Sequence, residues 1–136
     1  MLKTISAVLV LLASQTPMLA ATPLPVYPTE IQYIKYENAL EQFFSLPAIA
    51  PNAGKYLRTS DSQRRRDGQL LCSILTAYST DEYLTNELER HRLLYNDPQQ
   101  LRNENAYTLG VAAAAIDTIC TEHRASLLDF VQKYQK

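Results

Sequence analysis

Hydrophobic residues recur every three or four positions along most of the chain, which is the spacing of amphipathic helices. Thr29 and Gln32 form a capping-box sequence at the start of the first such stretch. Its apolar positions are Ile31, Ile34, Leu40, Phe43 and Phe44. Because Pro47 stops a helix, we expect the first helix to end near residue 46. The next segment, residues 47–54, is rich in turn-forming residues and is predicted to be a loop.

Two further capping signals predict the second and third helices. Ser60, with Gln63 three positions later, precedes a stripe of apolar residues at positions 71, 74, 75 and 78. We therefore expect a helix that runs from there to about Ser79. Ser79 or Thr80 begins the third helix, whose first turn carries two acidic residues that suit the positive end of the helix dipole.

A fourth helix is predicted to begin with Asp97 as its cap and Pro98 at its first position, where the missing N–H of proline costs nothing. It continues through an alanine-rich stretch to Cys120. Residues 126–134 either prolong this helix after a bend or form a short fifth one. Strands are not predicted, because alternating patterns are absent and the chain has only 3 glycines. The expected fold is an all-α bundle of four or five helices over residues 29–136.

The first 21 residues have the pattern of a secretory signal peptide. Lys3 provides a positive start, residues 5–13 form a short uncharged apolar run, and two alanines follow where a peptidase would cut. The alternative is a membrane anchor, but this run is much shorter than the ~20 residues that span a bilayer as a helix. We expect a mature chain that begins near Thr22, has no transmembrane segment, and starts with a mobile, extended, proline-rich leader over residues 22–28.

The two cysteines, Cys72 and Cys120, both lie in the mature part of the chain. A cysteine pair in an exported protein is far more often bonded than free, so we predict a disulfide between them. The alternatives are a metal site or a nucleophilic thiol. A metal site would need further ligands, and His91 and His123 are isolated in sequence. We expect neither a metal nor a cofactor.

The segments around the cysteines, residues 67–75 (DGQLLCSIL) and 109–120 (LGVAAAAIDTIC), resemble a small exported two-cysteine helical domain of unknown function. This family is common in mycobacteria and other actinobacteria, and the resemblance covers about residues 38–123. A departure is Thr121, where the family commonly has proline. The resemblance implies a disulfide-linked helical bundle outside the cytoplasm, and it implies no activity, cofactor or catalytic residue.

Composition and motifs argue against several functional classes. The chain has 13 basic and 14 acidic residues, so it lacks the excess positive charge of a nucleic-acid-binding protein. Glycine clusters for phosphate binding and a GxSxG nucleophile are also absent from the sequence. Glu87 and His91, four positions apart on a predicted helix, and Asp117 are the residues we considered for a hydrolytic site. We do not predict an enzyme.

Two groups of residues are candidates for contact with a partner. Arg64, Arg65 and Arg66 are the most concentrated charge in the chain, although acidic residues flank them and a solvated helix turn is the alternative. Tyr33 and Tyr36 share one side of the first helix, and tyrosine is favoured at contact surfaces. Packing in a core that lacks tryptophan is the alternative for the tyrosines.

These observations predict an exported, disulfide-linked helical domain that acts as a binding or structural module in the periplasm, cell envelope or extracellular space. Its expected partner is an unknown protein or envelope component, and not a nucleic acid. The alternatives are a secreted hydrolase with an unrecognised carboxylate or histidine site, and an inhibitor or immunity protein that acts outside the cytoplasm.

Overall fold

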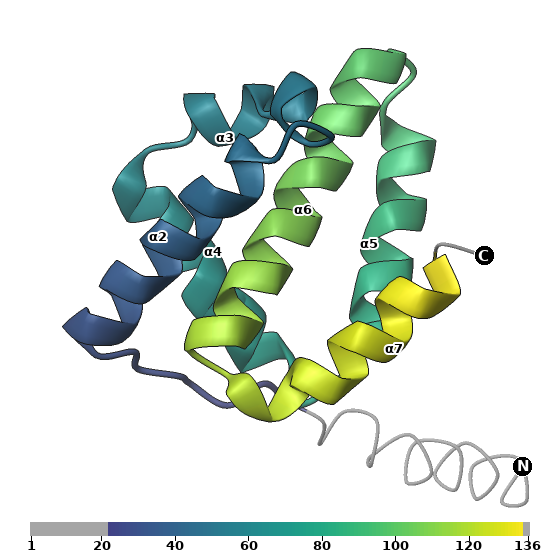
Figure 1. The fold of residues 1–136 in the computed structure, drawn as a ribbon. Helices are drawn as coiled ribbons and strands as arrows, with labels where there is room; N and C mark the ends of the chain where they lie inside the picture. The colour runs from purple at the N-terminus through teal and green to yellow at the C-terminus, as the bar shows by residue number, and fades with distance from the viewer. Residues whose placement is uncertain (1–21, 135–136) are drawn as a thin grey trace, which may run out of the picture.

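The computed structural model describes residues 22–134, and all regular structure in this part of the chain is helical. The predicted signal peptide lies outside the described residues. The α-helices are α2 (Glu30–Ser45), α3 (Gly54–Arg58), α4 (Asp61–Ile74), α5 (Thr80–Leu94), α6 (Pro98–Thr118) and α7 (Arg124–Tyr134), with two 3-10 turns, η1 (Ala50–Asn52) and η2 (Thr121–His123). Figure 1 shows α6 running through the middle of the domain between α2 and α5.

The predicted helix starts are confirmed, because each capping side chain binds the backbone as expected. The Thr29 hydroxyl accepts a hydrogen bond from the backbone N–H of Gln32 at 3.1 Å, and the Gln32 side chain accepts one from the N–H of Thr29 at 2.8 Å. Ser60, Ser79 and Asp97 each accept a hydrogen bond from the backbone N–H three residues later. These local contacts satisfy N–H groups that the first turn leaves free.

Three helix boundaries differ from or refine the prediction. The second predicted helix ends at Ile74 rather than near Ser79, because Ser79 caps α5 from an extended backbone (φ −71°, ψ 154°) and the chain leaves the helical conformation before it. The predicted loop at residues 47–54 contains η1 and leads into α3, which the sequence pattern did not predict. The last segment forms a separate helix, α7, after η2.

The core forms around α6, which contacts each of the other described α-helices. Its inner face is rich in small residues, so neighbouring helices approach closely. Gly110 lies against the ring of Phe44, where an added Cβ would come within 2.7 Å of the ring. From α2 the core receives Tyr36, Leu40 and Phe44.

Two of the predicted inner positions of the first helix face solvent instead. Ile31 is 67% exposed and Ile34 is 49% exposed. The inward face of α2 is set by Tyr36, which is fully buried against Gly68 of α4. The absence of a side chain on Gly68 admits the tyrosine ring, and this turns the two isoleucines outward.

The predicted cysteine pair is at disulfide-bonding distance. Cys72 of α4 and Cys120, which follows α6, have sulfur atoms 2.09 Å apart and Cα atoms 5.7 Å apart. Disulfides require a Cα separation of about 4.4–6.8 Å, closer than most packed helices allow. The buried residue Ala115 lies beside the pair, with its carbonyl oxygen 3.8 Å from each sulfur. The alanine stretch of α6 therefore permits the approach.

The leader, residues 22–28, has no regular structure and lies along α4 and the turn that follows it; its expected mobility stays a prediction. The N–H of Leu24 donates to the hydroxyl of Thr76 at 2.7 Å, and the hydroxyl of Ser73 donates to the carbonyl of Leu24 at 2.6 Å. Gln69 donates to the carbonyl of Val26 at 2.7 Å. Two polar side chains of α4, Gln69 and Ser73, and that of Thr76 just after the helix thus bind the leader. None of the helices between residues 22 and 134 has the length and apolar content that a membrane span requires.

Candidate functional site

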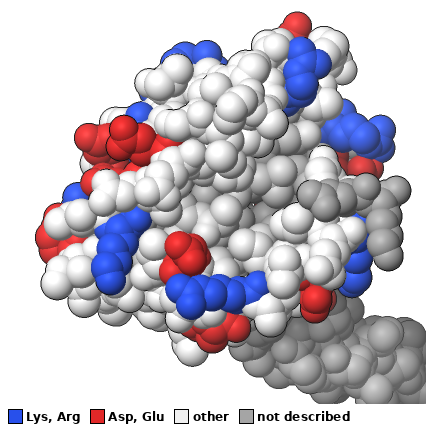
Figure 2. Space-filling model, viewed as in Figure 1, with Lys and Arg blue, Asp and Glu red and all other residues white. Residues whose placement is uncertain are grey.

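An open apolar groove lies between α2 and α7, with α6 as its floor. Its volume is about 610 Å³. The apolar residues that line it are Ala39, Phe43 and Leu46 of α2, Ala113, Ala114 and Ile116 of α6, and Leu127, Leu128 and Val131 of α7. Figure 2 shows this face of the molecule, where the hollow is uncharged and the charged side chains lie mostly around it. The volume of the groove and its apolar lining are typical of a ligand-binding site.

The groove exists because α7 docks on the domain through only two side chains, the buried Phe130 and the half-buried Leu127. Leu128 and Val131 of the same helix stay partly accessible, at 59% and 37% exposed. On the opposite wall, Leu46 is 50% exposed. Apolar side chains that gather at the rim of a hollow mark a contact surface more strongly than the same residues scattered singly.

One end of the groove is polar. Arg124 donates to the backbone carbonyl of Asp117 at 2.7 Å, and its guanidinium lies 3.4 Å from the Asp117 carboxylate. Both side chains are more than half exposed, so this ion pair contributes little to stability. Asp117 was one of the residues considered for a hydrolytic site, and the structure places it here, at the groove, rather than beside Glu87 and His91.

Glu87 and His91 lie together in a second, smaller pocket of about 260 Å³ between α4, α5 and α6. His91 is 2% exposed, and its Nδ1 is 3.0 Å from the side-chain oxygen of Asn105. Its Nε2 is 3.7 Å from the Glu87 carboxylate, which is too far for a hydrogen bond. Two of the three residues considered for hydrolysis are therefore neighbours, but the pocket lining includes no serine or cysteine that could act as a nucleophile.

Two tyrosines, Tyr83 and Tyr107, line this pocket. Burial raises the pKa of Tyr83 to about 12. Burial, together with a hydrogen bond from its hydroxyl to the carboxylate of Asp67, also raises the pKa of Tyr107 well above its ordinary value. Both phenols therefore stay protonated at neutral pH and can serve as hydrogen-bond donors. Among the described residues, no group of three or more His, Cys, Asp or Glu side chains is arranged to hold a metal ion.

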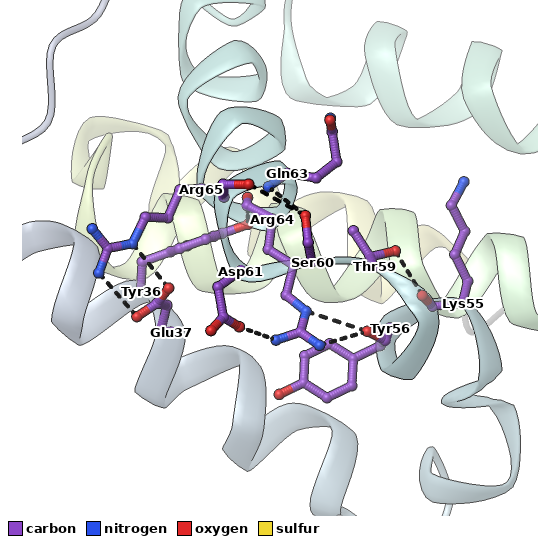
Figure 3. Close-up of polar contacts among 11 residues, drawn as sticks. Tyr36, Glu37, Lys55, Tyr56, Thr59, Ser60, Asp61, Gln63, Arg64 and Arg65 are labelled. Atoms are coloured by element: carbon purple, nitrogen blue, oxygen red, sulfur yellow. Dashed lines mark hydrogen bonds and ion pairs between the residues drawn. The ribbon is translucent and has the colours of Figure 1, made fainter.

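The arginines considered for partner contact are largely engaged within the fold, as Figure 3 shows. Arg64 donates to the backbone carbonyl of Tyr56 from two nitrogens, at 3.2 and 2.8 Å, and to Asp61 at 2.7 Å. Its guanidinium also lies 4.3 Å from the centre of the Tyr56 ring. With a side chain only 16% exposed, Arg64 ties α4 to α3.

Arg65 makes the corresponding connection to α2. It donates to both carboxylate oxygens of Glu37, at 2.9 and 3.2 Å, and to Glu30 at 3.1 Å. These carboxylates hold the pKa of Arg65 above its ordinary value through their hydrogen bonds. Arg66 is exposed. Most of the charge of the arginine run is thus balanced by acidic residues of the same chain.

The two tyrosines considered for partner contact also join helices. Tyr36 is 0% exposed and its hydroxyl donates to the backbone carbonyl of Arg64 at 2.6 Å, so it belongs to the core and cannot contact a partner. For Tyr36 the structure therefore supports the alternative given above, packing in the core. Tyr33 is half-buried, its hydroxyl donates to Gln69 at 3.3 Å, and the guanidinium of Arg65 lies 5.1 Å from its ring centre.

The groove itself was not found from the sequence. The last predicted segment, residues 126–134, carries the apolar residues Leu127, Leu128, Phe130 and Val131, but the pattern does not show which of them face the core. A signal was present, because a helix of 11 residues cannot turn adjacent positions such as 127 and 128 equally inward. Leftover apolar residues on a short terminal helix therefore pointed to a surface that needs a partner.

No family model, curated protein or solved structure was found to match this chain. The fold and the site alone therefore define the class of protein: a small disulfide-linked helical domain with an open apolar groove on one face and a small polar pocket between α4, α5 and α6.

Proposed function

We propose that this chain is an exported binding module of the periplasm, cell envelope or extracellular space, and that its apolar groove receives an amphipathic helix of a partner protein. Export is supported by the signal-peptide pattern of residues 1–21 and by the Cys72–Cys120 pair, since such bonds persist in oxidising compartments. The observation that carries the binding role is the set of half-exposed Leu and Val side chains along the groove.

The dimensions of the groove suit a helix. Its α2 wall extends from residue 39 to residue 46 and its α7 wall from residue 124 to residue 131. At a rise of about 1.5 Å per residue, each wall is about 10 Å long. A bound helix presents anchors at positions i, i+4 and i+7 over the same length, which is the usual arrangement when a helix lies in a groove.

An amphipathic helix fits this site better than an acyl chain. The rim residues Leu46 and Leu128 are 50% and 59% exposed, so the groove is open to water along its length. An acyl chain lying there would leave much of its own surface in water, where apolar exposure is unfavourable. A helix with one apolar face would cover the leucines and turn its polar face outward.

Site-specific photocrosslinking tests the proposal. A photoreactive residue replaces Leu128 in the mature, oxidised domain, and the matched control carries it in place of Leu57, which is 72% exposed on α3 away from the groove. Each protein is mixed with an envelope extract of the source organism, illuminated and analysed by mass spectrometry. We expect the Leu128 probe alone to join a peptide with apolar residues at helical spacing.

Three outcomes would contradict the proposal: adducts of lipid instead of peptide, equal labelling from both positions, or no adduct. A second variant checks the chemistry of the site, because Leu128→Asp should abolish crosslinking from a probe at Leu46 while Leu57→Asp should not. If the crosslinked peptide belongs to an enzyme, an activity assay of that enzyme with and without the domain distinguishes an inhibitor or immunity protein from a structural partner.

A further inference from the structure

The second pocket, between α4, α5 and α6, has a lining whose charges cancel. Its cations are Lys55 and Arg90, and its carboxylates are Asp67 and Glu87. Lys55 is paired with Glu104, and Arg90 donates to both oxygens of Glu87 at 3.1 and 2.8 Å. An anionic ligand would have to break one of these pairs and would also meet the carboxylate of Asp67. That carboxylate already accepts hydrogen bonds from Gln63 and Tyr107, so a neutral ligand with several hydroxyl groups fits the pocket better than an ion.

Hydrogen-bonding capacity remains unused on the α5 side of the same pocket. Tyr83, Glu87 and His91 follow one another at intervals of four residues and therefore share one face of α5. The hydroxyl of Tyr83 makes no hydrogen bond to another residue of the described chain. Nε2 of His91 is 3.7 Å from the nearest carboxylate oxygen of Glu87, so this nitrogen is also open to a ligand.

Carboxylate oxygens and apolar side chains complete the lining. Asp67 accepts from the Tyr107 hydroxyl and from Gln63 at 2.8 Å, and each of its oxygens has a second lone pair. Leu70, Leu71 and Val111 supply apolar surface. The volume of about 260 Å³ lies just below the range of ordinary small-molecule sites, about 300–1,000 Å³, and suits a ligand of one ring.

We propose that this pocket binds a single neutral sugar ring. A sugar carries no charge, donates and accepts hydrogen bonds through each hydroxyl, and has C–H groups that can contact leucine and valine. The Tyr83 hydroxyl donates to the sugar, His91 Nε2 bonds to a hydroxyl, and the free lone pairs of Asp67 accept from another. This site is separate from the groove, so it stands whether or not the groove binds a helix.

NMR titration of the mature, oxidised domain tests this inference. Glucose, galactose and N-acetylglucosamine are the neutral probes, and inorganic phosphate and choline are the charged ones. We expect at least one of the sugars to give saturable shifts at residues around Tyr83 and His91, with a dissociation constant in the millimolar range. The charged probes should give none there.

The Tyr83→Phe variant removes one hydroxyl and should weaken sugar binding about five- to tenfold, the effect expected for a lost hydrogen bond. Because this hydroxyl has no partner in the described chain, the variant should keep the melting temperature of the unmodified domain. Tyr78→Phe, at a tyrosine that is 45% exposed and outside the pocket, is the matched control. Absence of saturable binding by all three sugars, equal binding by Tyr83→Phe, or binding of a charged probe in their place would overturn the proposal.

Discussion

Replacing Gly68 by alanine sets helix propensity against packing, and the structure decides which effect prevails. In an isolated helix the substitution is favourable by about 1 kcal/mol. In the folded domain the new Cβ would lie 2.6 Å from Cζ and 2.9 Å from the hydroxyl oxygen of Tyr36. That ring is fully buried and its hydroxyl is bonded to the carbonyl of Arg64, so it cannot move aside without losing the bond.

The magnitudes give a net loss of stability. Overpacking a core costs about 1–3 kcal/mol, and loss of the Tyr36 hydrogen bond costs about 1 kcal/mol more. After subtraction of the propensity gain, Gly68→Ala should lower the free energy of unfolding by about 1–3 kcal/mol. Gly54→Ala is the matched control, because its Cβ would meet only the ends of the Asn103 and Arg58 side chains, which can rotate away.

Urea denaturation of the mature, oxidised domain, followed by circular dichroism at 222 nm, provides the measurement. Gly54→Ala should remain within about 0.5 kcal/mol of the unmodified protein. If Gly68→Ala were as stable as that protein or more stable, the close approach of α2 and α4 through Tyr36 would be refuted.

Three further predictions concern other buried groups. Removing the cysteine pair by Cys72→Ser/Cys120→Ser should lower the free energy of unfolding by about 4 kcal/mol, since the bond closes a loop of 48 residues; an unchanged denaturation midpoint would contradict this. Thr80→Val should be neutral or stabilise by about 1 kcal/mol, because the buried hydroxyl of Thr80 has no hydrogen-bond partner in the described chain, and a loss above about 1 kcal/mol in the same assay would show a hidden partner. Burial raises the pKa of Tyr83 to about 12, above the value of 10.0 for an unfolded chain, so the contribution of the protonated phenol to stability is present below pH 10 and is lost as pH rises toward 12. Tyr83→Phe should therefore remove one late-titrating phenol from the ultraviolet absorbance titration of the domain. An unaltered titration curve would argue against the burial of Tyr83.

Helix starts could be predicted from the sequence because caps are local. Thr29, Ser60, Ser79 and Asp97 each bond to a backbone N–H only three residues away. The rotation of a helix about its own axis is not local. Whether α2 buries its isoleucines or Tyr36 depends on Gly68, which lies 32 positions after Tyr36. The periodicity within residues 30–45 therefore cannot show which face of α2 is buried.

The short helix α3 escaped prediction for the same reason. Five residues are too few to be stable as an isolated helix. Tertiary contacts hold it in place: the ring of Tyr56 stacks on Phe44 with centroids 4.3 Å apart, and Arg64 binds the Tyr56 carbonyl. A segment that reads as a loop in the sequence becomes helical because neighbouring helices support it.

The candidate sites could be predicted only in part. Glu87 and His91 were correctly expected to share a helix face, since a spacing of four guarantees it. The sequence could not show that they lie opposite Asp67, because this depends on how α4 and α5 pack against α6. The groove depends on where α7 docks, and α7 docks through Phe130 and Leu127, two of several apolar residues that the sequence offered equally.

The account depends most directly on passage of this chain through a membrane into an oxidising compartment. Mass spectrometry of the protein isolated from its source, digested without reduction, tests this in one measurement. We predict a mature N-terminus near Thr22 and a single linked peptide pair that contains Cys72 and Cys120. An intact N-terminus at Met1 together with free thiols at both cysteines would contradict the account.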